Sequence, residues 1–428
     1  MMQLSFLGAA REVGRSGALL ETKKSKVVFD YGMKMAEERT TQPIYPLPVH
    51  GFLDAVVLSH AHLDHSGAVP MLFQASEPRV ITHTATVPIV ELLLADSMKI
   101  AGMHKHRCFT HSQLKRMLRN TDCVKYGEET TVTSDISVRM RDAGHILGAG
   151  IVEASVEGKS VVYTGDFKAS ETHLHKPADL PGKADAVIIE STYGGREHPP
   201  RKDIEKEFIA ALREVTDNGG SVLLPAFAVG RSQEIVSMLY ANRVDVPVYL
   251  DGMARPVSEV YMDFPELIRD YNEFYSAMKW VNWIVTPAMR DQVFNEPSIV
   301  VATAGMLSGG PAVTYVNDLK DVNNSAVFFT GFQVPGTPGH TLLAKNRLEC
   351  ENYSEDCTDL NVRYFDFSAH TGMDGLHALL KKSSPGVVFV NHGDETQCEA
   401  LRAWVENELG CYSFAPKLGE KYKLEDYV

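Results

Sequence analysis

The hexapeptide HAHLDH, residues 60–65, directly follows the apolar run Leu53–Ser59. It places three imidazoles and one carboxylate at the point where a buried strand is expected to reach solvent. Each of these groups loses hydration when it is buried without a partner, so four of them this close together rarely serve packing alone. We interpret them as two adjacent ligand pairs, His60 with His62 on one metal ion and Asp64 with His65 on another. The alternative interpretation is a polar loop with accidental histidines.

Three further segments repeat the pattern of an apolar strand followed by a potential ligand. His145 lies in the glycine-framed loop GHILG after the strand-like run 136–140, Asp166 ends the run SVVYTGD, and His392 follows VVFVN. Taken alone, His145 could be a satisfied core histidine and Asp166 a turn former. Open α/β sheets gather their sites at the carboxyl ends of strands, so potential ligands after four separate strands predict one common rim.

These motifs resemble those of the metallo-β-lactamase superfamily, and in particular its β-CASP branch of nucleic-acid-processing proteins. Four features of this chain resemble the superfamily's metal motifs, namely HAHLDH, the GH at 144–145, the GD at 165–166 and His392. Three signatures resemble the β-CASP branch, namely IIESTYG at 188–194, FSAHT at 367–371 and NHG at 391–393. Archaeal and bacterial homologues of the polyadenylation-factor endonuclease are the most similar members, and RNase J is related. The resemblance implies an α/β fold, a metallo-β-lactamase αββα sandwich with an inserted α/β β-CASP domain.

The same resemblance assigns roles to the candidate residues. It implies two Zn²⁺ ions, one held by His60, His62 and His145, the other by Asp64, His65 and His392, with Asp166 bridging them. Imidazole-rich ligation also favours zinc or another transition metal over Mg²⁺. His370 would donate a proton to the leaving oxygen, and Glu190 would orient it and raise its pKa. The alternatives are a hydrogen-bonded core histidine at 370 and a capping or salt-bridging acid at 190.

Strand-like and helical segments alternate along the chain, as in an α/β fold. Strands are expected at 3–7 and 25–30, and helices at 87–99 and 111–118. The region between Glu190 and His370 has a βα alternation of its own, with a helix at 208–216, a strand at 221–225, a helix opening at 230 and β-rich runs at 246–250, 298–303 and 326–331. We therefore predict a first domain part at 1–195, an inserted domain at 196–365 and a completing part at 366–428.

Composition restricts the class of protein. The chain has 428 residues, more than a usual single domain, with 44% hydrophobic and 23% charged residues. It contains no apolar run of about 20 residues, and its first residues are typical of a strand rather than a signal peptide. The six cysteines show no CxxC spacing, which favours free thiols in a reducing cytoplasm. We expect a cytoplasmic protein that does not contact membranes.

The formal charge of −13 counts against nucleic-acid binding, because phosphate neutralisation needs cations. An acidic chain must confine its positive charge to a cleft. The candidates for local basic charge, which could equally be solvated helix faces, are Lys99, Lys105, Arg107, Lys115, Arg116, Arg119, Lys168 and Arg231.

Two glycine-rich stretches bear on the substrate. Residues 303–311, TAGMLSGGP, are expected to join a strand to a helix, and the backbone N–H groups of such a turn can bind an anion. Ser308, Gly309, Arg231 and Ser368 are the candidate substrate contacts. A tight packing turn is the alternative at 303–311. The stretch 330–340 resembles a family segment that commonly ends in arginine, where this chain has His340. Since no GK[ST] follows a glycine-rich loop, we expect no nucleotide cofactor.

The sequence thus predicts a zinc-dependent ribonuclease that hydrolyses single-stranded RNA. Endonucleolytic and 5′-to-3′ exonucleolytic cleavage both stay open, as does DNA as the substrate. RNase J enzymes usually carry an additional C-terminal domain, and its absence favours endonuclease action. The alternatives are a small-molecule ester or thioester metallohydrolase and a non-catalytic RNA-binding scaffold. The tail 420–428 could complete an edge strand or pair two protomers in a homodimer.

Overall fold

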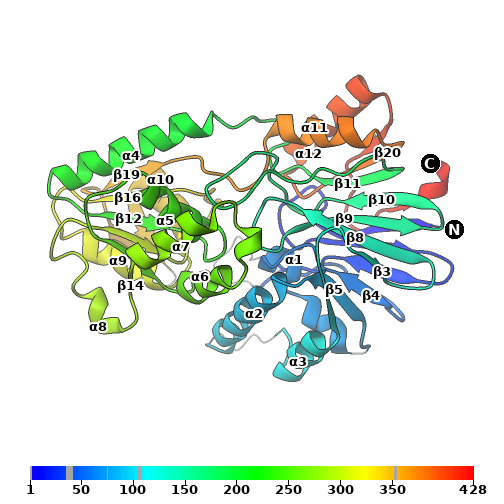
Figure 1. The fold of residues 1–428 in the computed structure, drawn as a ribbon, viewed down its shortest axis with the longest axis horizontal. Helices are drawn as coiled ribbons and strands as arrows, with labels where there is room; N and C mark the ends of the chain where they lie inside the picture. Colours follow the sequence, from blue (N-terminus) through cyan, green and yellow to red (C-terminus); the bar gives the residue numbers. More distant parts are fainter. Residues whose placement is uncertain (1, 35–41, 75, 104–107, 351–353) are drawn as a thin grey trace.

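The computed structural model describes residues 2–34, 42–74, 76–103, 108–350 and 354–428. The described chain forms two lobes, one built from its two ends and the other from its middle (Figure 1). In the first lobe, one seven-stranded sheet has the order β22 (Lys421–Lys423), β1 (Gln3–Gly8), β2 (Gly17–Glu21), β3 (Lys26–Phe29), β4 (Ala55–Val57), β5 (Arg79–His83) and β6 (Thr121–Val124). The other has the order β21 (Tyr412–Phe414), β20 (Val387–Asn391), β11 (Ala186–Glu190), β10 (Lys159–Tyr163), β9 (Gly150–Val156), β8 (Ile136–Asp142) and β7 (Glu129–Thr131).

These two sheets pack face to face and are covered by helices on their outer faces. Strand β8 alternates buried Ile136, Val138 and Met140 with half-buried residues, as a strand with one core face does. Aromatic rings fill the space between the sheets, and the rings of Phe29 and Tyr163 stack with centroids 5.3 Å apart. The outer layers hold α2 (Thr86–Met103) and α3 (His111–Arg119) on one side, and α11 (Met373–Ser383) and α12 (Glu395–Trp404) on the other (Figure 1). This arrangement confirms the predicted αββα sandwich.

The C-terminal tail completes a sheet of its own chain. Strand β22 pairs antiparallel with β1, with Gln3 opposite Lys423 and Ser5 opposite Lys421. The new edge strand is short and carries two lysines, which disfavours addition of a further strand. The tail 420–428 therefore forms an edge strand of its own chain, one of the two roles predicted for it. The other role, pairing two protomers in a homodimer, stays a prediction.

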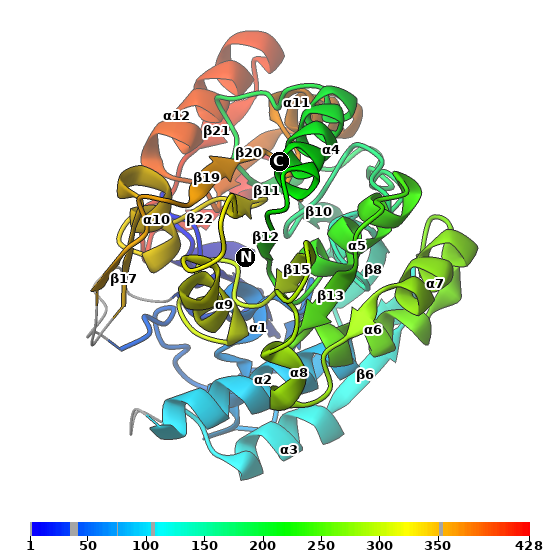
Figure 2. The same ribbon diagram turned by 90° about the vertical axis from the view of Figure 1, so that its left-hand side faces the viewer.

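The second lobe contains a six-stranded parallel sheet of the order β14 (Asn282–Trp283), β13 (Val248–Asp251), β15 (Ile299–Ala302), β12 (Val222–Pro225), β16 (Ala326–Phe329) and β19 (Asn361–Tyr364). Figure 2 shows α4 (Arg201–Asp217), α5 (Arg231–Ala241) and α7 (Tyr271–Trp280) on one side of it, and α9 (Pro311–Leu319) and α10 (Pro338–Lys345) on the other. Its central strands read VLLP, IVVA and AVFF, the continuous apolar runs of strands buried on both faces.

Shorter elements complete this lobe, namely α6 (Ala254–Met262), α8 (Pro287–Arg290), β17 (Arg347–Glu349) and β18 (Ser354–Asp356). The six-stranded sheet is built only from residues between 222 and 364. The domain boundaries after residues 195 and 365 stay predictions.

Contacts at the carboxyl edge of this sheet join the two lobes. In the β12–α5 segment, Glu234 is buried and accepts hydrogen bonds from the backbone N–H groups of His173 (3.0 Å) and Leu174 (3.1 Å), and it also contacts Arg201. The hydroxyl of Tyr261, on α6, accepts a hydrogen bond from the backbone N–H of Leu147 (3.1 Å). The carboxyl ends of the parallel strands therefore face the 145–147 loop of the first lobe.

The six cysteines are all free thiols. In the described ranges, every helix is too short or too polar to cross a bilayer.

Candidate metal centre

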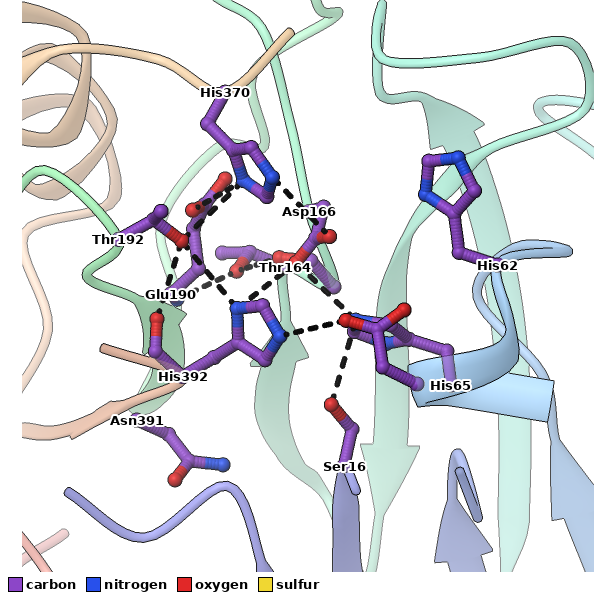
Figure 3. A network of polar contacts seen from close by, with 12 residues as sticks. Ser16, His62, His65, Thr164, Asp166, Glu190, Thr192, His370, Asn391 and His392 are labelled. Carbon is purple, nitrogen blue, oxygen red and sulfur yellow. Dashed lines mark hydrogen bonds and ion pairs between the residues drawn. The ribbon is translucent and has the colours of Figure 1, made fainter. Parts of the chain in front are cut away.

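The structure brings the seven predicted metal ligands together at one rim of the sandwich. They stand just beyond strand ends: His60, His62, Asp64 and His65 after β4, on and before the short helix α1 (Leu63–Ser66), His145 after β8, Asp166 after β10 and His392 after β20. Figure 3 labels four of them, His62, His65, Asp166 and His392. Glycines allow the tight backbone turns directly before two of these ligands, His145 and Asp166. Gly144 has φ +63° and Gly165 has φ +50°, and a Cβ built on Gly165 would lie 2.7 Å from the side chain of Ser59.

One group of four side chains consists of His60, His62, His145 and Asp166. The Nδ1 atom of His62 lies 3.2 Å from His60 Nε2 and 3.1 Å from His145 Nε2. The Oδ2 atom of Asp166 lies 3.6 Å from His60 Nε2 and 3.7 Å from His145 Nε2. These four side chains therefore converge on one point.

A second group consists of Asp64, His65, Asp166 and His392. The Oδ2 atom of Asp64 lies 3.3 Å from His392 Nε2 and 3.9 Å from His65 Nε2. The other oxygen of Asp166, Oδ1, lies 3.3 Å from His65 Nε2 and 3.3 Å from His392 Nδ1. Asp166 thus offers one oxygen to each group, which is the arrangement that a bridging ligand needs.

Both groups fit a metal ion by their donor atoms and spacing. Within each, the ligand atoms lie within 4.8 Å of one another. Atoms that share a tetrahedral zinc at ~2.0–2.1 Å lie roughly 3.3–3.4 Å apart, close to the distances found here. The Oδ1 atom of Asp166 is buried and accepts no well-aligned hydrogen bond from the described residues. A buried carboxylate oxygen with no well-aligned donor gains from a neighbouring cation, either a protonated His65 or a metal ion that replaces its proton.

The protonation of the imidazoles favours metal binding at the first group. Burial lowers the pKa of His60 and of His145 well below 6.5, and it lowers the pKa of His62 as well. These three rings are therefore neutral at pH 7, the form that donates a lone pair to a metal. Burial also opposes charge on His65, but Asp166, Asp64 and Asp30 outweigh it and raise the pKa of His65 well above 6.5. A cation placed among these carboxylates would displace that proton.

His370 lies beside the ligands and is held by Glu190, as Figure 3 shows. Its Nδ1 lies 2.9 Å from Glu190 Oε2, and its Nε2 lies 3.8 Å from Asp166 Oδ2. Burial disfavours the charged ring, but the carboxylates of Glu190 and Asp166 outweigh it and raise the pKa of His370 to about 9. Glu190 is itself fixed, because its Oε1 accepts a hydrogen bond from the backbone N–H of Phe167 (2.9 Å). The ring is therefore protonated at neutral pH and directs Nε2 toward the metal groups.

Several residues that support the site were not predicted. Asp30 is fully buried, accepts hydrogen bonds from the N–H and hydroxyl of Ser59 (2.7 and 2.6 Å), and lies 2.6 Å from His65 Nδ1. Thr192 Oγ1 lies 3.3 Å from His370 Nδ1 and 3.4 Å from His392 Nδ1. Asp30 follows the apolar strand KVVF just as Asp166 follows SVVYTG, so the same strand-exit pattern could have identified it. Nothing in the sequence marks Thr192 as a bridge between two histidines.

Asp30→Asn is expected to weaken metal binding about 10- to 100-fold, because Asp30 orients the ring of His65 and fixes its tautomer. Zinc titration of the metal-free protein with a competing chelator measures this affinity. Ser5→Ala, at another buried polar position of the same sheet, serves as the control and should leave the affinity unchanged. Wild-type affinity in Asp30→Asn would show that His65 does not depend on this contact.

The predicted substrate contacts lie in different environments. Arg231 is 8% exposed, and its Nε is buried without a hydrogen-bond partner in the described chain. Ser308 and Gly309 lie on the turn before α9, with Ser308 exposed. The hydroxyl of Ser368 accepts a hydrogen bond from the N–H of His370 (3.1 Å). Of the predicted basic candidates, Lys105 and Arg107 lie outside the described residues.

Positive charge gathers beside His370 despite the acidic composition. Lys168 is buried, and its Nζ donates a hydrogen bond to the carbonyl oxygen of His370 (2.7 Å). Burial, Arg201 and Arg231 lower the pKa of Lys168 to about 8, and burial and Arg201 lower the pKa of Arg231 to about 10. Lys168, Arg201 and Arg231 therefore sit close enough to influence one another, and Glu234, which pairs with Arg201, offsets part of their charge. An anionic ligand would be attracted to the remaining positive charge.

Comparisons with known proteins give matches along most of the chain. Family models match as a metallo-beta-lactamase superfamily domain at residues 19–191, a Beta-Casp domain at 233–342, and a Zn-dependent metallo-hydrolase RNA specificity domain at 359–416. A solved structure from Enterococcus faecalis, of a protein of unknown function, shares the fold with a TM-score of 0.65 at 15% identity and covers 98% of this chain and 99% of that one.

Curated relatives extend over the whole chain. The "Probable RNase MJ4" of Methanocaldococcus jannaschii is 36% identical over 99% of this chain and 100% of its own length. The "RNase aCSPSF2" of Saccharolobus solfataricus is 35% identical over 98% of this chain and 85% of its own. A "Transcription termination factor FttA" of M. jannaschii is 32% identical over 93% and 68%, respectively. The chain therefore belongs to the β-CASP branch of the metallo-β-lactamase superfamily.

Proposed function

We propose that this protein is a ribonuclease that uses two zinc ions per chain to hydrolyse phosphodiester bonds of single-stranded RNA. The observation that carries the proposal is the pair of ligand groups sharing Asp166, with the His370–Glu190 pair beside them. Relatives named as RNases support RNA as the substrate. The complete ligand set disfavours a non-catalytic scaffold, and a large second lobe in contact with the 145–147 loop disfavours a small-molecule hydrolase.

The protein's own residues would hold the ions and move one proton. His60, His62 and His145 would hold one ion, Asp64, His65 and His392 the other, and Asp166 would contact both. A bound zinc pair supplies Lewis-acid stabilisation of the phosphate and an activated water. His370, held by Glu190 at Nδ1, presents a protonated Nε2 that donates to the leaving oxygen. Glu190 keeps that proton on the ring until transfer, because its carboxylate stabilises the imidazolium.

Arg231 and Lys168 are proposed to receive RNA phosphates, with Ser368 and the Ser308–Gly309 turn as further contacts. Arg231→Ala should weaken RNA binding, and the slope of log K against log salt should fall by about 0.7, the value for removing one cation that neutralises a phosphate of a single strand. Filter binding at several salt concentrations measures both. Arg231→Lys, which keeps the charge, is the matched control and should retain the slope. An unchanged slope in Arg231→Ala would place the phosphate path elsewhere.

A time course on denaturing gels tests the function. One single-stranded RNA is labelled at the 5′ end in one tube and internally in another, with zinc-loaded wild type and Asp64→Ala side by side. Discrete internal fragments that the variant does not produce indicate an endonuclease, and immediate release of 5′ mononucleotide indicates a 5′ exonuclease. Intact RNA with the zinc-loaded wild type would contradict the proposal.

Location and assembly are part of the same proposal. Six free cysteines suit a reducing cytoplasm, where RNA processing or decay would take place. A homodimer through the C-terminal segment could use the outer edge of β22, which its two lysines disfavour, or the side chains around it, and the sedimentation of the purified protein tests whether a dimer forms.

A further inference from the structure

The carboxyl edge of the six-stranded sheet faces the metal centre. Strand β12 ends at Pro225, and the loop after it runs through Phe227 to Gly230, where a built Cβ would lie 2.8 Å from the side chain of Ile146, the residue after His145. Strand β19 ends at Tyr364 and leads within a few residues to His370. Side chains in the loops of this edge therefore border the approach to the site.

Two large aromatic side chains stand exposed in these loops. Phe227, two residues after β12, is 40% exposed, and Phe332, three residues after β16, is 54% exposed. Strands β12 and β16 are parallel neighbours, so both loops leave the same part of the edge. Leaving aromatic surface in water forgoes the free energy that burial would supply, so two exposed rings on neighbouring loops of this edge favour a binding role.

Hydrogen bonds hold the backbone at or next to both phenylalanines. The carbonyl oxygen of Phe227 accepts hydrogen bonds from the hydroxyl and the N–H of Ser232 (2.7 and 3.2 Å). Next to Phe332, the buried amide of Gln333 donates to the carbonyl oxygens of Gly305 (3.1 Å) and Gly331 (3.0 Å). These bonds tie the loop after β16 to the loop after β15.

Glycine lets the two aromatic loops approach each other. A Cβ built on Gly331 would lie 3.3 Å from Cε2 of the Phe227 ring, so a side chain at 331 would press on that ring. The ring of Phe227 therefore lies against the backbone next to Phe332. A ring that already packs on one side, as that of Phe227 does, loses less conformational entropy when a flat ligand stacks on it.

The charges around these rings indicate the kind of ligand. Arg231 lies four residues after Phe227, is buried, and has no ion pair in the described chain, and Lys168 and Arg201 influence its charge. Exposed aromatic faces beside a track of positive charge are the combination that binds single-stranded nucleic acids, with bases on the rings and phosphates on the cations. A protein or lipid partner would not need the buried cations.

We propose that Phe227 and Phe332 form a stacking platform for unpaired bases of the RNA that enters the metal centre. This inference rests on the proposed function and adds the group that is recognised, the flat face of an unpaired nucleobase. The platform accepts any base, requires no 2′-hydroxyl, and rejects bases that are paired in a duplex, because their faces are already stacked.

The test compares Phe227→Leu and Phe332→Leu with wild type. Leucine keeps an apolar side chain of similar bulk and removes the aromatic face, whereas Phe227→Trp keeps that face. Phe52→Leu, at a residue that is 71% exposed in the loop before β4, is the matched control. Values of kcat/KM are measured on a short single-stranded RNA and on the same RNA carrying abasic sites near the cleavage position, together with zinc content and Tm.

Each leucine variant at 227 or 332 should lose about 5- to 100-fold in kcat/KM on normal RNA, mainly through KM, with zinc content and Tm unchanged. The abasic RNA should be a poor substrate for wild type and should no longer distinguish it from the leucine variants. Phe52→Leu should cleave like wild type, and Phe227→Trp should keep the discrimination between normal and abasic RNA that Phe227→Leu loses. Leucine variants within twofold of wild type, or an equal loss on both RNAs, would overturn the platform while leaving the ribonuclease intact. A wild type that neither binds nor cleaves RNA would instead overturn the proposed function.

Discussion

Asp64→Ala is expected to lower kcat/KM on single-stranded RNA by about a thousandfold or more. The carboxylate of Asp64 supplies one oxygen to the second ligand group, 3.3 Å from His392 Nε2. Without it, that group keeps two imidazoles and a shared oxygen of Asp166, so the second ion would lose one of its four protein ligands and the negative charge that Asp64 supplies. Loss of the Lewis acid at one side of the phosphate removes several kcal/mol of transition-state stabilisation, and each 1.4 kcal/mol is worth a tenfold change in rate.

The same variant should keep its fold. The side chain of Asp64 is 31% exposed, and its backbone carbonyl, which accepts a hydrogen bond from Ser16 N–H (2.7 Å), is not altered. Gel-based rates, elemental analysis of bound zinc and thermal unfolding of the metal-free protein check these points together. We expect about one zinc ion less per chain and a Tm close to that of the metal-free wild type. Undiminished cleavage with two ions bound would refute the assignment of Asp64.

His370→Ala is expected to reduce kcat by about 10²- to 10⁴-fold while both zinc ions stay bound, because general acid catalysis contributes rate enhancements of that size. His370 is paired with Glu190 and lies beside both ligand groups, and we propose that its loss removes a proton donor rather than a metal ligand, although His370, Glu190 and Asp166 also lie close enough together to hold an ion. Glu190→Gln should show a smaller decrease of the same kind, since the amide still positions the ring but no longer stabilises its charge. Zinc content and single-turnover rates are the measurements.

A change of leaving group distinguishes proton donation from a merely structural role. A phosphodiester that releases p-nitrophenolate needs little protonation, so wild type and His370→Ala should hydrolyse it at similar rates, while they differ strongly on RNA. Asp64→Ala, in contrast, should be impaired on both substrates. An equal loss of His370→Ala on both substrates, or loss of zinc, would make His370 a structural residue or a ligand.

Sequence patterns were sufficient to predict the local features of this protein, its strands and the residues at their ends. Apolar runs such as SVVY and VVFV mark strands, and the polar residues directly after them, Asp166 and His392, mark positions at strand exits. Strand formation and strand ends depend on residues close in sequence, so these features can be predicted from one chain. The resemblance of the ordered motifs then supplied the αββα sandwich, which the structure confirms.

The tertiary structure decided which of these positions meet. The contact of His370 with Glu190 joins residues 180 positions apart, and Asp166 meets ligands that follow β4 and β20, which are far from it in the chain. The burial of Arg231 beside Lys168, the support of His65 by Asp30, and the exposed rings of Phe227 and Phe332 all depend on how the second lobe and its loops pack. A single sequence therefore determined the donor atoms and their strands. Strand order, register and lobe packing decided their distances and charges, because these rest on contacts between residues far apart in the chain.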